Sequence, residues 1–138
     1  MKTIIVALKG LVFKNGRLLI VKRAQNDEVG GGTWETVGGK MEFGEDFELA
    51  LKREFLEEVG LEIQVKSLLF ATTFFTKKNR QIVLLTFLCE YISDSIQLSS
   101  EHEEFLWASK DEVEVLLPQS ILDDYIQHGI FKMKEFFD

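Results

Sequence analysis

Three glutamates, Glu54, Glu57 and Glu58, stand at positions i, i+3 and i+4 of one short segment. In an α-helix this spacing places the three side chains on one face, with Cβ atoms about 5–6 Å apart. Like charges at that spacing destabilise a helix by about 0.2–0.5 kcal/mol per pair. A hard divalent cation such as Mg²⁺ removes that repulsion, because it prefers carboxylate oxygens. The cluster therefore predicts either a divalent-metal site or an acidic helix face exposed to solvent.

The residues around the three glutamates favour the metal site. Gly39 precedes the predicted helix, Glu45 opens it, Arg53 adjoins the first glutamate and Gly60 ends it, so that the whole reads G-x5-E-x7-R-E-F-x-E-E-x-G-L. If each of the seven fixed positions were matched at the ~7% usage of a common residue, the chance of a match in this chain would be about one in a million. The pattern is therefore specific.

This segment resembles the Nudix box, G-x5-E-x7-R-E-U-x-E-E-x-G-U, in which U is a bulky aliphatic residue. Every fixed position matches, namely Gly39, Glu45, Arg53, Glu54, Glu57, Glu58 and Gly60. Phe55 is aromatic at the first U position, where we expect altered packing and unchanged chemistry. Val37 stands where many family members have a proline before the glycine pair, which removes no functional group.

The resemblance extends over residues 3–118 and implies an α/β (α+β) fold, an α/β/α sandwich with a mixed β-sheet. The segment 18–23 looks like the second strand of the family, and the segment 101–111 looks like its late glutamate loop and tryptophan. We expect residues 1–138 to form a single Nudix hydrolase domain.

The implied activity is hydrolysis of a diphosphate bond in a nucleoside diphosphate linked to another group. Carried over residue by residue, Glu54, Glu57 and Glu58 bind Mg²⁺, for which Mn²⁺ can substitute. Glu54 also helps to deprotonate the attacking water. The backbone carbonyl of Gly38 and the side chain of Glu101 are further candidate metal ligands. Glu101 is equally explained as one more solvated charge in the acidic stretch 101–104.

The remaining box residues are expected to hold the catalytic ones in place. Arg53 belongs to the implied catalytic set, where with Glu45 it fixes the loop against the helix rather than contacting the reacting phosphorus. Gly60 is expected to cap the end of the helix. His102, in the same acidic loop, is most simply an exposed histidine.

Four residues are candidates for binding the substrate. Arg23 occupies the place of a phosphate-contacting arginine, although an exposed cation at a strand end also forms surface ion pairs. Gly39 belongs to the loop beside the glutamates. Trp34 either stacks on a base or packs in the core, and Gln119 lies near the place where MutT-like members read a purine.

The substrate is set outside the box. About fifteen residues after the box, ADP-ribose-type members carry a proline and dinucleoside-polyphosphate types a tyrosine, whereas this chain has FTKKN at 75–79. We therefore expect a MutT-like (deoxy)nucleoside triphosphate pyrophosphohydrolase that releases a monophosphate and pyrophosphate. ADP-ribose, a nucleotide sugar or another diphosphate is the alternative. A non-catalytic binding module is a third reading, which the intact box glutamates disfavour.

The elements that position these residues are visible in the apolar pattern. Asn15-Gly16 between apolar runs predicts a tight hairpin turn. A helix is expected at 46–59, and long strands are expected at 61–75 and 81–91 around a polar turn at 76–80. Capping boxes at 109–112 and 120–123 predict two closing helices, with Gly129 inside the last one. The glycine-rich segment 24–33 is expected to be a loop, which is either a mobile surface connection or a loop on the substrate side.

The amino-acid composition limits the class of protein and the kinds of binding partner. The 138 residues are 46% hydrophobic with 10 Gly and one Pro, which excludes a disordered or collagen-like chain. Asp and Glu outnumber Lys and Arg by 23 to 16, and the net charge of −7 argues against nucleic-acid and anionic-membrane partners. A small anionic substrate then needs a local cation. A lone Cys89 suits the core, the apolar stretches are too short to span a membrane, and we expect a cytoplasmic protein. Family members often dimerise, so a homodimer stays open.

Overall fold

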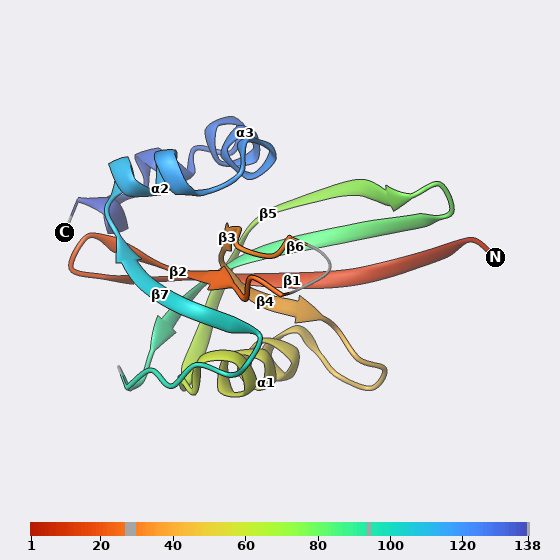
Figure 1. The fold of residues 1–138 in the computed structure, drawn as a ribbon, viewed down its shortest axis with the longest axis horizontal. Coiled ribbons are helices and arrows are strands. Elements are labelled where there is room, and N and C mark those ends of the chain that lie inside the picture. Colours follow the sequence, from red (N-terminus) through yellow and green to blue (C-terminus); the bar gives the residue numbers. More distant parts are fainter. Residues whose placement is uncertain (27–29, 94, 138) are drawn as a thin grey trace.

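The computed structural model describes residues 1–26, 30–93 and 95–137, where one sheet lies between two layers of helices (Figure 1). The strands are β1 (Thr3–Lys14), β2 (Arg17–Arg23), β3 (Trp34–Glu35), β4 (Val37–Lys40), β5 (Ile63–Lys77), β6 (Arg80–Tyr91) and β7 (His102–Ala108). The helices are α1 (Phe47–Val59), α2 (Lys110–Leu116) and α3 (Gln119–Gln127), followed by the short 3₁₀ helices η1 (Ile130–Lys132) and η2 (Lys134–Phe136).

The sheet is mixed, as predicted. Its main path runs β3-β2-β1-β6-β5, with β4 paired to β1 and β7 paired to β2. The β1 and β6 strands run parallel, and the other strand pairs among the described residues are antiparallel. The first ten residues of β1 pair with β6, while its last two pair with β2. One long strand therefore joins the two halves of the sheet.

The hairpin between β1 and β2 turns where the sequence predicts. Asn15 and Gly16 both have positive φ, 52° and 78°. That pair of conformations is the type I′ turn, whose twist matches the twist of the flanking strands. The prediction is confirmed because asparagine and glycine are the residues that adopt left-handed backbone at least cost.

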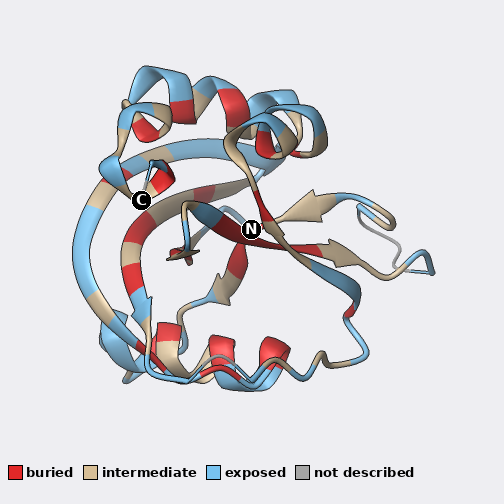
Figure 2. Cartoon of the chain, turned by 90° about the vertical axis from the view of Figure 1, so that its left-hand side faces the viewer, coloured by how far each residue is buried: buried red, intermediate tan, exposed pale blue. Residues whose placement is uncertain are grey.

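Each face of the sheet carries its own apolar core. Helix α1 lies against one face, while α2 and α3 lie against the other (Figure 1), and the buried positions of these helices turn toward the sheet (Figure 2). Phe55, the aromatic replacement in the box, is fully buried in the core under α1. A Cβ at Gly10 of β1 would lie 2.6 Å from its ring. The missing side chain at Gly10 thus makes room for the aromatic residue, and the change alters packing as expected.

Helix α1 begins and ends at the predicted residues. Asp46 is its N-cap, and the Asp46 carboxylate accepts a hydrogen bond of 2.8 Å from the backbone N–H of Leu49. Gly60 ends the helix in the left-handed conformation with φ of 68°. The box glutamates are consequently fixed on a helix with both ends defined.

The C-terminal helices agree only in part with those predicted. Ser109 forms the predicted capping box with Glu112 at the start of α2. The second capping box is wrong, because α3 begins at Gln119 with Pro118 as its N-cap and without a side-chain cap. The carbonyl of Pro118 already accepts from the backbone N–H groups of residues 121 and 122, which places Ser120 inside the helix. Gly129 lies beyond the end of α3, so it does not weaken that helix.

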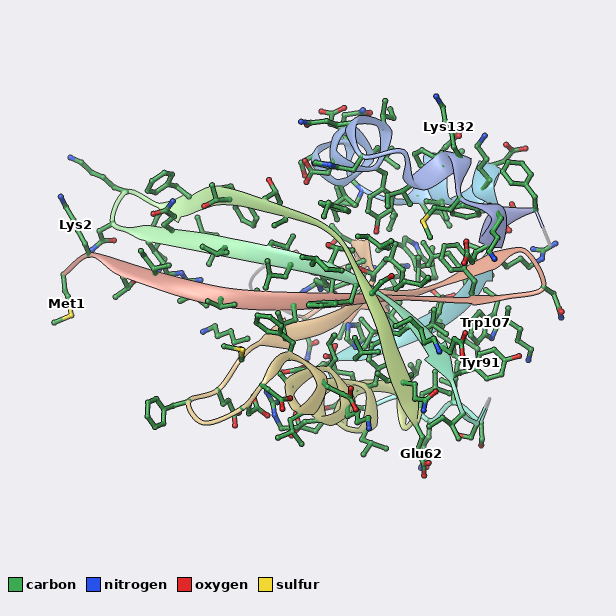
Figure 3. The ribbon with its side chains drawn as sticks, turned by 180° about the vertical axis from the view of Figure 1, so that it is seen from behind. Met1, Lys2, Glu62, Tyr91, Trp107 and Lys132 are labelled. Atoms are coloured by element: carbon green, nitrogen blue, oxygen red, sulfur yellow. The ribbon has the colours of Figure 1, made fainter. Side chains whose placement is uncertain are left out.

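The β5–β6 hairpin is longer than predicted. Its strands leave only Lys78 and Asn79 as the turn, in place of the five-residue turn expected at 76–80. The hairpin and the N-terminal part of β1 extend together beyond the helices (Figure 1). At the opposite end, the rings of Tyr91 and Trp107 pack with centroids 6.0 Å apart (Figure 3). Among the described residues, no helix has the length and apolar character needed to cross a bilayer.

Candidate active site

A pocket of about 530 Å³ opens beside β4, between α1 and the sheet. Its lining comes from β1, β2, β3, β4, α1, β6 and the segment before β7. The lining residues are Ile5, Ala7, Lys9, Arg23, Glu35, Gly38, Gly39, Lys40, Glu42, Arg53, Glu54, Glu57, Glu58, Ile82 and Glu101. The volume lies within the range of about 300–1,000 Å³ that is typical of small-molecule sites.

All three box glutamates line this pocket, but they differ in exposure. The side chain of Glu58 is 5% exposed and that of Glu54 is 14% exposed, whereas Glu57 remains 61% exposed. Carboxylates are rarely removed from water unless they are paired or bind a cation. A solvated acidic helix face therefore does not describe this cluster.

The state of Glu58 in the free chain fits a cation site. Burial is the main factor that raises the pKa of Glu58 well above its usual range, and a hydrogen bond with Glu54 raises it further, while the charge of Lys9 opposes both effects. Among the described residues, Oε2 of Glu58 has no hydrogen-bond partner. An orphaned buried oxygen next to a second carboxylate is the donor chemistry that a hard divalent cation satisfies, so these residues fit the implied metal.

Strand β4, which leads into the loop before α1, approaches the glutamates closely because its two glycines lack side chains. A Cβ at Gly39 would lie 2.6 Å from the carboxylate of Glu54. A Cβ at Gly38 would collide with the backbone carbonyl of Leu8. The glycine pair thus allows the loop backbone to lie directly against the acidic face, with the neighbouring strand behind it.

Arg53 joins the loop to the helix. Its guanidinium donates to both carboxylate oxygens of Glu45, at 2.6 and 2.9 Å, to the carbonyl of Lys40 at 3.0 Å and to Glu54 at 2.9 Å. The bond to Arg53 is the main reason why the pKa of Glu45 falls to about 2. The Glu45 carboxylate also accepts from the backbone N–H of Glu42 at 2.7 Å. The structure therefore gives Arg53 and Glu45 the arrangement expected of them.

Three functional candidates were missed or misjudged from sequence: Lys9, Glu35 and His102. The Lys9 ammonium lies 3.4 Å from Glu35, and the Arg23 guanidinium lies at the same distance from it. Burial acts to raise the pKa of Glu35, but the hydrogen bond from His102 and the two cations outweigh it and lower that pKa to about 2. His102 is 5% exposed, so its interpretation as an exposed histidine is wrong.

The sequence carried a usable signal for only one of the three. Lys9 interrupts the apolar run of β1, and a lysine within a buried strand is uncommon unless its ammonium has a partner. Glu35 and His102 are separated by 67 residues, and no local pattern connects them.

The substrate-binding candidates divide into two groups. Arg23 and Gly39 line the pocket together with the glutamates, and so does Glu101, the further candidate metal ligand. Trp34 packs against the core on the α2–α3 side, and Gln119 is exposed in α3, where its amide donates to Asp123 at 2.8 Å. Neither of them is part of the pocket lining among the described residues. The glycine-rich loop includes residues 27–29, which lie outside the described residues.

Comparison with known proteins places this geometry in a family. The NUDIX domain profile matches residues 5–127. The chain is 37% identical over 109 residues to a MutT-like protein of Streptomyces ambofaciens, covering 78% of this chain and 66% of that protein. It is 27% identical over 116 residues to the nucleoside triphosphatase NudI of Enterobacter sp. (strain 638), covering 77% and 82% of the two chains.

A third relative and a solved structure also resemble this chain. The chain is 31% identical over 100 residues to an ADP-ribose pyrophosphatase of Methanocaldococcus jannaschii, covering 72% of this chain and 58% of that protein. The crystal structure of a MutT protein from Methanosarcina mazei Go1 superposes with a TM-score of 0.83 at 24% identity, covering 96% and 98% of the two chains, which shows the fold. The chain belongs to the NUDIX family and is a Nudix hydrolase of the kind that includes MutT, NudI and ADP-ribose pyrophosphatases.

Proposed function

We propose that this Nudix hydrolase cleaves (deoxy)nucleoside triphosphates to a nucleoside monophosphate and pyrophosphate, with Mg²⁺ as its metal and Mn²⁺ as a substitute. One observation carries the proposal: a single pocket joins an acidic cluster, cationic side chains and an apolar strip of strand residues. Each of these parts fits one part of a nucleoside triphosphate.

The acidic part fits a metal-bound phosphate chain. Glu54, Glu57, Glu58 and the carbonyl of Gly38 would hold the metal, and Glu101 reaches the same pocket. A bound divalent cation neutralises phosphate charge and activates a water molecule. The ammonium and guanidinium groups of Lys9 and Arg23 stand at the pocket wall, where they supply the local positive charge that a triphosphate needs to approach a chain of net charge −7.

The apolar part fits a nucleoside. Ile5 of β1 pairs in register with Ile82 of β6, and Ile82 pairs with Phe74 of β5. Residues that lie opposite one another in a sheet point to the same face, so the three side chains form one apolar platform. Ile5 and Ile82 line the pocket, and Phe74 remains 44% exposed beside them. An unfilled apolar platform next to a phosphate site is suited to a base or sugar.

The chain's own residues account for the proton in the cleavage step. A water molecule adds to one phosphorus, the bridging P–O bond breaks, and the bridging oxygen leaves with the other phosphate. The proton of the water passes to the Glu54 carboxylate. Arg53 donates to the Oε1 oxygen of Glu54 at 2.9 Å, which fixes the orientation of this carboxylate.

A second substrate class has its own support. The relative from Methanocaldococcus jannaschii that is named an ADP-ribose pyrophosphatase is 31% identical. The relatives named nucleoside triphosphatase are 26–27% identical over slightly longer alignments. ADP-ribose carries the same diphosphate bond, and its second ribose would lie beyond the phosphates, on the side away from the apolar platform. The triphosphate is preferred because residues 75–79, FTKKN, lack the proline that ADP-ribose-type members carry at this place.

The test measures monophosphate, pyrophosphate and phosphate release with and without Mg²⁺. The panel holds the canonical and 8-oxo (deoxy)nucleoside triphosphates, ADP-ribose, a dinucleoside tetraphosphate and nucleotide sugars. Glu54→Gln is the catalytic variant, and Glu48→Gln, on the exposed side of α1 in an ion pair with Lys52, is its matched control. Loss of a general base lowers kcat by about 10²–10⁴-fold.

The outcomes separate the candidates. Metal-dependent release of pyrophosphate from triphosphates, lost in Glu54→Gln and retained in Glu48→Gln, supports the proposal. Turnover of ADP-ribose alone would agree with the assigned site, but it would make ADP-ribose the substrate in place of a triphosphate. A Glu54→Gln enzyme as fast as the parent removes Glu54 from its proposed role.

A further inference from the structure

At the wall of the pocket, three side chains from separate elements meet at one point, with Glu35 and Glu58 in the lining and His102 buried beside them. Nε2 of His102, the first residue of β7, lies 2.9 Å from Oε2 of Glu35 in β3. The same nitrogen lies 3.7 Å from Oε1 of Glu58 in α1. The His102 side chain is 1% exposed, and those of Glu35 and Glu58 are 16% and 5% exposed. The imidazole therefore lies between a box glutamate and a carboxylate outside the box.

The direction of the hydrogen bond is determined by the chemistry of its acceptor. Glu35 is flanked by the Lys9 ammonium and the Arg23 guanidinium, each 3.4 Å away, so this carboxyl is ionised and only accepts hydrogen bonds. Nε2 of His102 therefore carries a proton and donates it to Glu35. The edge of the imidazole also lies beside Glu58, where Nε2 is 3.7 Å from Oε1, a close contact that is longer than a hydrogen bond.

Main-chain bonds hold this histidine in register with the helix that carries the glutamate. The backbone N–H of Ser99 donates to the carbonyl of Glu58 at 2.9 Å, and that of Gln97 donates to the carbonyl of Val59 at 2.8 Å. The N–H of His102 in turn donates to the carbonyl of Ser99 at 3.3 Å. The start of β7 is thus attached to the last turn of α1, and the imidazole has a fixed position relative to Glu58.

We propose that His102 and Glu35 are positioning residues for Glu58. Glu35, held by Lys9 and Arg23, fixes the imidazole, and the imidazole fixes the Oε1 side of the Glu58 carboxylate. This leaves Oε2, the oxygen without a hydrogen-bond partner among the described residues, as the one offered to a cation. The inference rests on the metal-ligand role of Glu58 in the proposed function, and it adds two residues that the box does not contain.

The arrangement follows a general property of metal sites. Groups that hydrogen-bond to a ligand hold it in its binding orientation, and their loss typically weakens metal affinity by 10–100-fold. His102 contacts Glu58 at 3.7 Å without a hydrogen bond, so we expect an effect at the lower end of that range. The difference here is that the histidine supports a carboxylate ligand and a second carboxylate supports the histidine. The ion pairs of Glu35 also connect the metal ligand to the two cations that face the substrate's phosphates.

The test measures Mn²⁺ affinity of the full chain without nucleotide, by electron paramagnetic resonance, together with kcat and KM. His102→Leu removes the N–H and fills the buried space, whereas His102→Gln keeps an N–H near the position of Nε2. We expect Mn²⁺ to bind about tenfold more weakly to His102→Leu and within about threefold of the parent to His102→Gln. Cys89→Ala is the control for lost stability, because Cys89 is buried in the core away from the pocket.

A double-mutant cycle shows whether His102 acts through Glu58. In a Glu58→Gln background, adding His102→Leu should cause no further loss of Mn²⁺ affinity, because the side chain that His102 positions has been changed. A purely structural effect would persist in that background. Circular dichroism and urea unfolding confirm that each variant is folded before its affinity is compared.

Three results would overturn the inference. Unchanged Mn²⁺ affinity in His102→Leu would show that the histidine does not position a ligand. An equal loss in the Glu58→Gln background would show that it does not act through Glu58. Equally weak binding in His102→Leu and His102→Gln, with a Co²⁺ spectrum that loses an imidazole ligand, would make His102 a metal ligand itself. Because Mn²⁺ binding needs no substrate, a chain that binds Mn²⁺ but cleaves no triphosphate refutes the proposed function alone.

Discussion

At the scale of single residues, the site depends on two opposite requirements. Glu58 is buried so that its charge is poorly solvated, while Glu57, one residue earlier, stays in water. The cluster therefore combines a buried carboxylate, whose poorly solvated charge a bound cation would stabilise, with an exposed carboxylate that an incoming cation would reach first. The glycine pair of β4 matters as much as the glutamates, because it determines how closely the backbone approaches them.

Gly39→Ala tests that approach. The added Cβ would lie 2.6 Å from the Glu54 carboxylate, so Glu54 must move from the position in which Arg53 holds it. We expect kcat to fall by at least tenfold with little change in the free energy of unfolding. Gly44→Ala, in the same loop, is the control. It has no neighbour within 4 Å at its Cβ, and its φ of 91° costs stability without touching the site. Equal activity of both variants would contradict the role of the close approach.

At the scale of elements, α1 and the loop before it behave as one unit. The Arg53 guanidinium connects the loop at Glu45 and Lys40 to the face that carries the glutamates. Capping at Asp46 and Gly60 fixes where the helix begins and ends. The box pattern thus encodes a rigid loop–helix unit as well as a helix face that carries three glutamates.

Glu45→Gln is expected to lose stability in a pH-dependent way. The pKa of Glu45 in the folded chain is about 2, below its usual 4.5, chiefly because of Arg53. A group whose pKa is lowered by folding stabilises the fold above its unfolded pKa and loses this contribution as the pH falls. The difference in the free energy of unfolding between the parent and Glu45→Gln should be largest above pH 4.5 and shrink toward pH 2. Urea unfolding at several pH values measures it, and a constant difference would contradict the assignment.

Gly60→Ala tests the end of the helix. At φ of 68° an alanine is strained, and we expect the variant to lose about 1–2 kcal/mol of unfolding free energy. Gly60→Asn should lose less, because asparagine tolerates the left-handed conformation better. The comparison is made by thermal unfolding, and equal melting temperatures for the parent and both variants would rule out this capping role.

At the scale of the whole molecule, the sheet separates two apolar cores. The pocket lies on the face of the sheet that α1 covers. The α1 side and the α2–α3 side are packed independently, and the pocket takes residues from both halves of the sheet. A ligand in the pocket would therefore contact several parts of the chain at once. Binding to the folded state alone stabilises it.

Mg²⁺ should consequently raise the melting temperature of the chain. At a Mg²⁺ concentration of 100 times Kd, linkage gives about 2.7 kcal/mol of added stability, which corresponds to a shift of several degrees. The reason is that a cation relieves the repulsion and desolvation of Glu54 and Glu58. The double variant Glu54→Gln/Glu58→Gln is the control and should show no Mg²⁺-dependent shift in calorimetry. A similar shift in both chains would place the metal elsewhere.

The sequence alone determined what depends on local spacing. The hairpin at Asn15-Gly16, the helix bounded by Asp46 and Gly60 and the shared face of the box glutamates follow from turn chemistry, capping and the helical period. The family resemblance added the mixed sheet. The second capping box failed because Pro118 supplied a helix start two residues earlier, which spacing rules do not weigh.

Only the tertiary structure decided which side chains meet across the sheet. Lys9, Glu35 and His102 lie on β1, β3 and β7, and their contacts depend on strand order and register, which have no local signature. Burial has the same origin: Glu57 and Glu58 are neighbours in sequence, yet the packing of α1 against the sheet leaves one in water and encloses the other. For that reason the shared face of the box glutamates could be predicted from spacing, whereas the residues that contact them from other strands could not.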